Sequence, residues 1–374
     1  MMPGAAKGLR ILVLLTDAYG GHGGIAAYNR DVLGALCADP DVAEVVALPR
    51  LAALPLGPLP AKLTFDLAAL GGGPRYLSAV VKHLSARGGF DLVYCAHLNL
   101  IPVARLAAAI ARAPMILAVY GIDAWEPHPR LMVRKTAGSA DHVLSISQVT
   151  LDRFRGWQSY PDASCSLMPN AIHLEQFGIG PKNADLLAQY GLAGRKVLMT
   201  FGRLAGSERY KGFDAVLDAM PELVREMPDI VYVIAGDGSD RERLEQKARD
   251  MGMAGHVVFT GMVDEADKAE LYRLADVYVM PSQGEGFGFV LLEAMACGVP
   301  TIASTADGGR EALRNGLLGL LVDPENPIEI IDAVRASFDR PRGIPEGLEY
   351  FSFPQFSRRL RTVVHAVIDR ARGG

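Results

Sequence analysis

The chain has 374 residues, of which 50% are hydrophobic and 21% charged, values typical of a folded globular protein with about two domains. Its 38 basic and 42 acidic residues give a net charge of -4, which argues against a protein built mainly to neutralise nucleic-acid phosphates. The four cysteines are far apart and form no C-x-x-C pair, so neither a disulfide framework nor a zinc site is expected.

Short apolar runs alternate with longer segments of helical period, the pattern of strand-helix units around a parallel sheet. The strands expected in the first half are 11–15, 42–48, 92–95, 115–119 and 143–146. Those expected in the second half are 197–201, 230–235, 257–259, 277–280, 301–303 and 320–322. In each half the first strand leads into a glycine-containing loop and a helix, which predicts two Rossmann-like α/β domains.

Glycine, proline and asparagine between residues 178 and 183 favour a domain boundary there. We expect a first domain over 1–178, a linker over 179–195, a second domain over 196–352 and a final helical segment over 353–374. Segment 49–60 contains three prolines among leucines, which indicates an irregular loop packed on its own domain, with contact to lipid or a partner as the alternative. Residues 98–119 are apolar, but two arginines and a proline interrupt them. The uninterrupted apolar run is shorter than a membrane-spanning helix needs, so we expect a cytoplasmic protein.

The most informative segment begins at Glu285 and continues through Gly286, Phe287 and Gly288 into a helix expected over 288–297. The two glycines let the backbone approach a ligand closely, and the free amides of the helix start favour a phosphate. Glu293 lies in the second turn of the same helix. Because carboxylates accept hydrogen bonds from sugar hydroxyls, the segment predicts a site for a ligand with both phosphate and hydroxyl groups.

Arg203 follows a buried strand and Gly202, the place where open α/β sheets bind ligands. Together with Lys211 it could stabilise the negative charge on a leaving diphosphate. Residues 206–210 lie between Arg203 and Lys211, a longer spacing than the shortest loop would need. Arg209, within this stretch, is an alternative second cation.

In the first domain a glycine-rich loop, residues 20–24, follows the first strand. Gly21, Gly23 and Ala26 fit the G-x-G-x-x-A fingerprint, so an NAD-dependent oxidoreductase is an alternative function. The second strand ends without the acidic residue that would hold a ribose, which weakens that alternative. His97 follows the expected strand 92–95, at the carboxyl end where such sheets bind ligands.

Glu285 and Glu293 match the E-x7-E motif of retaining glycosyltransferases of the GT-B fold, and the stretch EGFGFVLLEAMACGVPTIAS resembles family four of these enzymes. Gly202-Arg203 with Lys211-Gly212 resembles the diphosphate clamp of that family, and 307–311 resembles its later glycine turn. Segment 170–177 resembles the part that leads into the interdomain linker. The resemblance implies two Rossmann-like domains facing a central cleft, with the final helix crossing back to the first domain.

The resemblance also implies the reaction: transfer of a hexosyl-type sugar from UDP or GDP to an acceptor hydroxyl, with retained anomeric configuration. The acceptor would be a glycan or a lipid-linked saccharide in surface polysaccharide or glycoconjugate synthesis. No metal or other cofactor is implied beyond the nucleoside diphosphate sugar. We also expect peripheral contact with the inner face of the membrane. No nucleic-acid partner is expected.

By the same resemblance, Arg203 and Lys211 hold the diphosphate, Glu285 the transferred sugar and Glu293 the ribose, while His97 orients the sugar. The other expected donor contacts are Gly23, Gly24, Gly202, Gly261, Val263, Gly286, Phe287 and Gly288. The acceptor-side candidates are His22, Tyr120 and Asp123, with Tyr120 standing where the family pattern has histidine.

No carboxylate is placed as a nucleophile on the far face of the sugar, so a same-face mechanism assisted by the leaving phosphate is expected. Segment 39–41 has the D-x-D pattern of metal-dependent glycosyltransferases, but its central proline favours a turn and no metal site is predicted there. A nucleotide-sugar epimerase of the same fold and a non-catalytic sugar-nucleotide sensor remain as alternatives.

Overall fold

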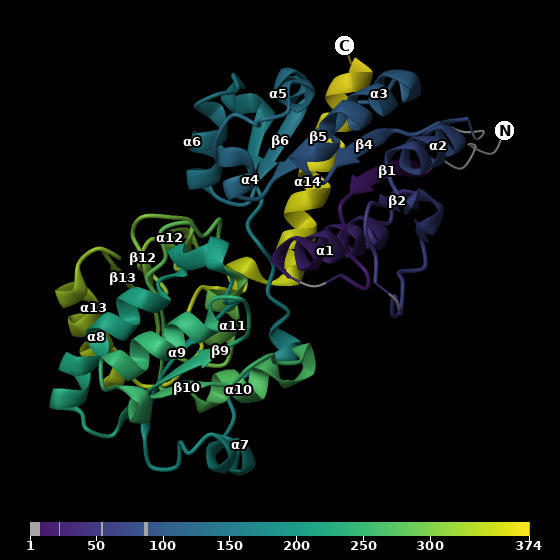
Figure 1. Cartoon of the computed structure of the whole chain (residues 1–374). Coiled ribbons are helices and arrows are strands. Elements are labelled where there is room, and N and C mark those ends of the chain that lie inside the picture. Colours follow the sequence, from purple (N-terminus) through teal and green to yellow (C-terminus); the bar gives the residue numbers. More distant parts are fainter. Residues whose placement is uncertain (1–7, 22, 54, 86–88, 374) are drawn as a thin grey trace. The chain divides into compact units, whose positions relative to one another are not determined.

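The computed structural model describes residues 8–21, 23–53, 55–85 and 89–373. The chain divides into two compact units, one formed by Met1–Ala171 with Phe353–Gly374 and the other by Ile172–Ser352 (Figure 1). The second unit therefore begins at Ile172, earlier than the expected boundary at 178, and Ile172 donates a backbone hydrogen bond to Phe351 within that unit. The segment expected to be a linker contains helix α7 (Ala184–Gln189) and belongs to the second unit.

Unit 1 is built on a parallel sheet with strand order β3-β2-β1-β4-β5-β6-β7. The strands are β1 (Leu9–Leu15), β2 (Val42–Pro49), β3 (Leu63–Phe65), β4 (Leu92–Cys95), β5 (Met115–Val119), β6 (His142–Ser145) and β7 (Cys165–Leu167). Strands β3 and β7 were not predicted from the sequence. Both are three-residue strands at the sheet edges and only partly buried, so they lack the continuous apolar run of a central strand.

The helices of unit 1 cover both faces of this sheet (Figure 1). They are α1 (Gly24–Ala38), α2 (Gly73–Leu84), α3 (Ile101–Ala111), α4 (Ile122–Trp125), α5 (Leu131–Thr136), α6 (Gln148–Arg155) and α14 (Phe353–Gly373). Helix α14 packs against α1, where the ring of Phe356 lies edge-on to Tyr28 with 5.5 Å between centroids. The last helix of the chain thus completes the core of the first unit.

Unit 2 has a parallel sheet with strand order β10-β9-β8-β11-β12-β13. Its strands are β8 (Lys196–Phe201), β9 (Ile230–Ala235), β10 (Val257–Phe259), β11 (Val277–Met280), β12 (Thr301–Ser304) and β13 (Leu320–Val322). Its other helices are α8 (Phe213–Glu226), α9 (Arg241–Asp250), α10 (Lys268–Leu274), α11 (Phe289–Ala296), α12 (Gly309–Ala312) and α13 (Pro327–Phe338).

The strand order reverses direction at the same place in both units. In unit 1 the first strand lies between β2 and β4, and in unit 2 the corresponding β8 lies between β9 and β11. Loops that leave the carboxyl ends of these adjacent strands diverge, which opens the crevice where α/β sheets bind ligands. The fold is therefore the expected pair of Rossmann-like domains. In the part of the chain that the structure describes, no helix has the length and apolar character needed to cross a membrane.

Candidate active site

Three of the predicted site residues meet at the switch point of unit 2. Arg203 follows β8 and Glu285 follows the adjacent β11, while Lys211 reaches in from the 3-10 segment Gly206–Lys211. The Lys211 Nζ lies 3.3 Å from Glu285 Oε2 and 3.7 Å from Glu208 Oε2. Arg203 forms an ion pair with the other oxygen of Glu208. These four residues are called the cation cluster below; Glu208 was not predicted, although its place between the two cations in the long loop was a signal.

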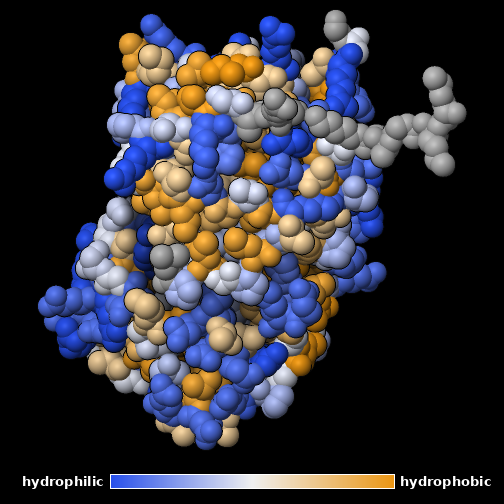
Figure 2. All heavy atoms as spheres, turned by 90° about the vertical axis from the view of Figure 1, so that its right-hand side faces the viewer, coloured by the Kyte–Doolittle hydropathy of each residue, from blue (hydrophilic) through white to orange (hydrophobic). Residues whose placement is uncertain are grey.

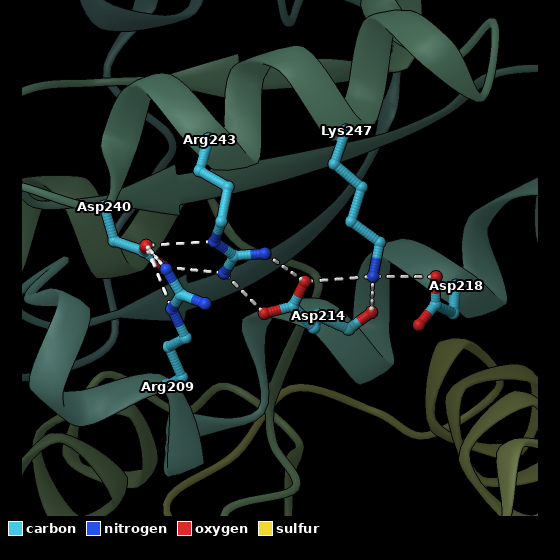
Figure 3. A network of polar contacts seen from close by, with 6 residues as sticks. All are labelled: Arg209, Asp214, Asp218, Asp240, Arg243 and Lys247. Carbon is cyan, nitrogen blue, oxygen red and sulfur yellow. Dashed lines mark hydrogen bonds and ion pairs between the residues drawn. The ribbon is translucent and has the colours of Figure 1, made fainter.

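The loop between Arg203 and Lys211 directs Glu208 and Arg209 to different partners. Its helical geometry is broken at Glu208, which has a φ of -119°. Arg209 points away from the cation cluster, and its guanidinium lies 3.0 Å from Asp240 (Figure 3). Asp240 is also bound by Arg243, which pairs in turn with Asp214. The geometry therefore favours Lys211 over Arg209 as the second cation.

Lys211 is held in its charged form. Burial by itself lowers the pKa of its ammonium group, but the negative charge of Glu285, with smaller contributions from Tyr210 and Glu208, outweighs burial and leaves the pKa raised. The loop ends at Gly212, which has a φ of +84° and would place a Cβ 2.4 Å from the Pro281 carbonyl oxygen. Only glycine fits here, so the sequence Lys-Gly fixes the lysine against the loop after β11.

Asp307, which sequence reasoning treated only as part of a glycine turn, holds the loop that carries Glu285. Its Oδ2 accepts hydrogen bonds from Ser282 Oγ and the Glu285 amide, both at 2.7 Å. Its Oδ1 accepts the Gly309 amide at 2.9 Å. Burial raises the pKa of this carboxyl to about 6, although the hydrogen bonds partly offset that rise.

The glycines between the two glutamates allow a tight crossing of two loops. A Cβ on Gly308 would lie 2.0 Å from the Gly286 carbonyl oxygen, and Gly288 has a φ of +92°. The side chain of Phe287 was expected to contact the donor. It is instead buried edge-on against Phe351, with 5.4 Å between ring centroids. Its backbone alone can therefore face a ligand.

Glu293 is buried in the second turn of α11. Its Oε2 accepts a hydrogen bond from the Tyr272 hydroxyl at 2.7 Å, and its Oε1 lies 3.3 Å from Lys268 Nζ. Burial raises the pKa of this carboxyl, and the charge of Lys268 only partly offsets the effect. Neither partner was predicted, because both lie on α10 more than twenty residues before the glutamate. The expected base-side residues follow β10, where Gly261 accepts a hydrogen bond from Gly236 at 3.2 Å and Val263 is partly exposed.

In unit 1, His97 and Asp123 lie together at the carboxyl ends of β4 and β5. The Nδ1 of His97 accepts the Asn99 amide at 3.1 Å, so the neutral ring carries its proton on Nε2. That Nε2 is 4.0 Å from Asp123 Oδ2, an oxygen without a hydrogen-bond partner among the described residues. Burial lowers the pKa of His97 to about 4 and raises that of Asp123 to about 7. The pair offers an uncharged donor and a buried acceptor to a hydroxyl.

Tyr120, another acceptor-side candidate, is buried and does not present its side chain to a ligand as His97 and Asp123 do. Its hydroxyl donates to Asn29 Oδ1 at 3.0 Å and its ring packs edge-on to Tyr28, so the side chain belongs to the core of unit 1. Gly23 precedes α1 with a φ of +95°, and Gly24 is the exposed first residue of that helix. His22, the remaining acceptor-side candidate, lies outside the described residues.

Comparison with protein families matches both units. Residues 195–339 match the family described as "Glycosyl transferases group 1", and residues 4–171 match the "Glycosyl transferase 4-like domain". The chain belongs to the group 1 glycosyltransferases. Its nucleotide-sugar chemistry accords with the cation cluster at the switch point of unit 2.

Curated relatives of this glycosyltransferase include mycobacterial mannosyltransferases. A "GDP-mannose-dependent alpha-(1-6)-phosphatidylinositol monomannoside mannosyltransferase" of Mycolicibacterium smegmatis is 33% identical over 252 residues, a match that spans 64% of each chain. A "Phosphatidyl-myo-inositol mannosyltransferase" of Mycobacterium leprae is 32% identical over 305 residues, 80% of this chain and 76% of the relative. Among solved structures, Anabaena HepE in complex with UDP has a TM-score of 0.77 and 21% identity, covering 96% of this chain and 100% of that one, and shares the fold.

The D-x-D segment of this glycosyltransferase lies in unit 1 against α14. Asp39, Asp41 and His365 bring possible metal-ligand atoms within 4.8 Å of one another. Arg361 enters the same group, 2.7 Å from Asp41 and 3.4 Å from Asp39. A guanidinium already neutralises these carboxylates, so the arrangement serves to attach α14 to the loop before β2.

Proposed function

We propose that the chain transfers mannose from GDP-mannose to a hydroxyl group of a phosphoinositide-type membrane lipid, with retention of the anomeric configuration and without a metal ion. The observation that carries this proposal is the cation cluster, in which Arg203 and Lys211 stand at the switch point beside Glu285. The choice of sugar, base and lipid rests on the functions that the names of the mycobacterial relatives state, GDP-mannose dependence and mannosylation of phosphatidylinositol.

In the proposed reaction the bond between the sugar C1 and the leaving phosphate oxygen breaks, and a bond forms between C1 and the acceptor oxygen. The acceptor proton passes to the leaving phosphate on the same face of the sugar. Arg203 and Lys211 stabilise the charge that develops on the diphosphate, while the carboxylate of Glu285 accepts hydrogen bonds from the sugar hydroxyls. His97, neutral because burial lowers its pKa to about 4, can donate a hydrogen bond from Nε2 to a hydroxyl group without bringing a positive charge.

One surface of unit 1 supports a lipid acceptor. Helix α3 packs beside α2 and α5, and these three helices contain no acidic residue. Large aliphatic side chains are nevertheless exposed on them, among them Leu106 at 48%, Ile110 at 53% and Met132 at 64%. Figure 2, which views the molecule from the side that carries α2, shows hydrophobic residues beside strongly hydrophilic ones. This α2–α3–α5 face has the apolar and cationic character of a surface that rests on an anionic bilayer.

The charge of the surrounding sequence points the same way. Residues 67–140 contain eight Lys or Arg against three Asp or Glu, although the whole chain is net negative. The exposed cations on the three helices are Arg75, Lys82, Arg105, Arg134 and Lys135. Each cation close to an anionic membrane contributes about 1 kcal/mol to binding, so a handful of them with the aliphatic side chains would give reversible attachment.

The donor and acceptor are tested in one assay. The purified chain is incubated with GDP-mannose, or with UDP-glucose as the alternative donor, and vesicles that contain phosphatidylinositol. We expect a mannosylated lipid that α-mannosidase cleaves, formed equally well in EDTA. Conversion of the donor sugar without any acceptor would favour an epimerase, and loss of transfer in EDTA that manganese restores would contradict the metal-free mechanism. Thermal shift gives an independent readout, since GDP at 100 times its dissociation constant stabilises by about 2.7 kcal/mol.

The membrane face is tested by sedimentation with vesicles. The chain should sediment with phosphatidylglycerol vesicles and much less with phosphatidylcholine vesicles. Replacing Leu106 and Ile110 by glutamine should reduce sedimentation several-fold. The matched control is Ile328→Gln on α13, a residue that is 68% exposed on the other unit. An equal loss in the control, or no preference for anionic lipid, would contradict a membrane role for this face.

A further inference from the structure

Glu208 stands in the cation cluster without a part in the donor chemistry described above. Its side chain is only 13% exposed, and its two oxygens face the two residues proposed to hold the diphosphate. Arg203, in contrast, is 72% exposed, so it meets the carboxylate from the solvent side. The carboxylate therefore occupies the place between the cations that a phosphate group of the donor would need.

The charges of the cluster already cancel. Arg203 and Lys211 bring two positive charges, and Glu208 and Glu285 bring two negative ones. A diphosphate ester adds about two negative charges, so with Glu208 in place the occupied site would carry an unbalanced negative charge. Glu285 has a separate task, because it faces the sugar hydroxyls in the proposed reaction. The displaced anion is therefore Glu208.

The loop can release this side chain without unfolding its surroundings. Helical geometry is interrupted at Glu208 itself, between Gly206 and Gly212. The neighbouring Arg209 is fixed on the opposite side by Asp240, whose other partner Arg243 is anchored by Asp214 (Figure 3). A change confined to the Glu208 side chain and its adjacent peptide would leave that network intact.

We propose that Glu208 is an internal competitor of the donor, whose carboxylate occupies the diphosphate cations until a nucleoside diphosphate sugar displaces it. The inference rests on the proposed function of Arg203 and Lys211. A ligand that offers only phosphate exchanges one anion for another at these cations and gains little. A complete donor also gains contacts from its sugar and ribose, so it displaces the carboxylate, and after transfer the return of Glu208 helps to expel the nucleoside diphosphate.

The test compares ligand binding by the wild type, Glu208→Gln and the control Glu245→Gln, whose carboxylate pairs with Arg241 on α9 at 2.7 Å. Calorimetry with GDP, UDP and inorganic pyrophosphate gives the affinities. Because glutamine keeps the shape but removes the charge, Glu208→Gln should bind GDP or UDP on the order of tenfold more tightly, and pyrophosphate likewise. Product inhibition during turnover should strengthen by a similar factor, and Glu245→Gln should match the wild type.

Unchanged or weaker nucleotide binding by Glu208→Gln would overturn the inference and would assign the glutamate to support of the loop. Glu208→Ala, which cannot hold Arg203 in place, gives a second measure: tighter binding by both variants supports displacement, and weaker binding by both contradicts it. If the folded wild type binds no nucleoside diphosphate, the proposed function itself fails. If the wild type binds it and neither variant binds more tightly, only the role of Glu208 fails.

Discussion

The two units place different chemistry on the same edge of the same kind of sheet. In unit 2 the carboxyl ends of β8 and β11 lead to Arg203 and Glu285, each in an ion pair with an oppositely charged side chain. In unit 1 the carboxyl ends of β4 and β5 carry His97 and Asp123, whose pKa values are shifted by burial toward the neutral forms. The fold supplies the crevice, and the loop residues determine which kind of ligand suits it.

This difference accords with the two substrates of the proposed reaction. A leaving diphosphate gains negative charge as its bond to the sugar breaks, and fixed cations stabilise that charge. An acceptor hydroxyl is neutral, and buried uncharged groups can orient it through hydrogen bonds without a large desolvation cost.

The largest effect is expected at the two cations. Arg203→Ala and Lys211→Ala should each lower kcat on the order of a hundredfold or more while leaving the fold intact, because each removes a charge partner of the transition state. Arg209→Ala is the control, since that residue pairs with Asp240 away from the cluster. Initial rates at saturating donor and circular dichroism provide the measurement. A severe loss in Arg209→Ala beside a near-normal Lys211→Ala would show that the other cation acts.

The two glutamates should separate binding from turnover. Glu293→Gln should mostly weaken binding of the free nucleoside diphosphate, because ribose contacts do not change during the reaction. Glu285→Gln should lower the transfer rate on the order of tenfold or more with less effect on nucleotide binding, because it faces the sugar that gains positive charge. Calorimetry with the free nucleotide and rates at saturating donor distinguish these effects. The reverse assignment would mean that the donor lies in the opposite direction along α11.

A smaller, pH-dependent effect is expected at Asp307. As pH falls through about 6 this carboxyl takes up a proton, and its hydrogen bonds to Ser282 and the Glu285 amide weaken. The wild-type kcat should therefore fall several-fold on the acid side of pH 6. Asp307→Asn should have a lower kcat near pH 8 and a flatter profile below it. An identical acid limb in the variant would assign the titration to another group.

The smallest effect concerns stability in unit 1. The folded chain holds the Asp123 proton more tightly than the unfolded chain does, because burial raises the pKa from 3.8 to about 7. The stability gained at low pH is therefore lost as pH rises from about 4 through 7. Compared with Asp123→Asn, the wild type should lose a few degrees of Tm over this range. Parallel Tm curves for the two proteins would show that the carboxyl ionises without cost.

Local sequence patterns predicted the central part of each sheet and the approximate place of the donor site. The apolar runs of β1, β5, β9 and β11 are long enough to be recognised, and the glycines before α11 mark a loop that approaches a ligand. The edge strands β3 and β7 escaped prediction because their few residues are half exposed and are defined by pairing with a neighbour. Pairing between strands leaves little trace in three residues of sequence.

Residue types and spacing by themselves determined the α/β class, the strand-loop-helix opening repeated in each half, and the presence of two cations and two carboxylates for a sugar diphosphate. Only the tertiary structure decided which groups meet. It turned Arg209 toward Asp240, directed Phe287 and Tyr120 into the cores, and placed Glu208 between the cations. Hydrophobic periodicity is a local property of the chain, whereas an ion pair such as Lys211 with Glu285 joins loops 74 residues apart that meet only because their strands are neighbours in the folded sheet.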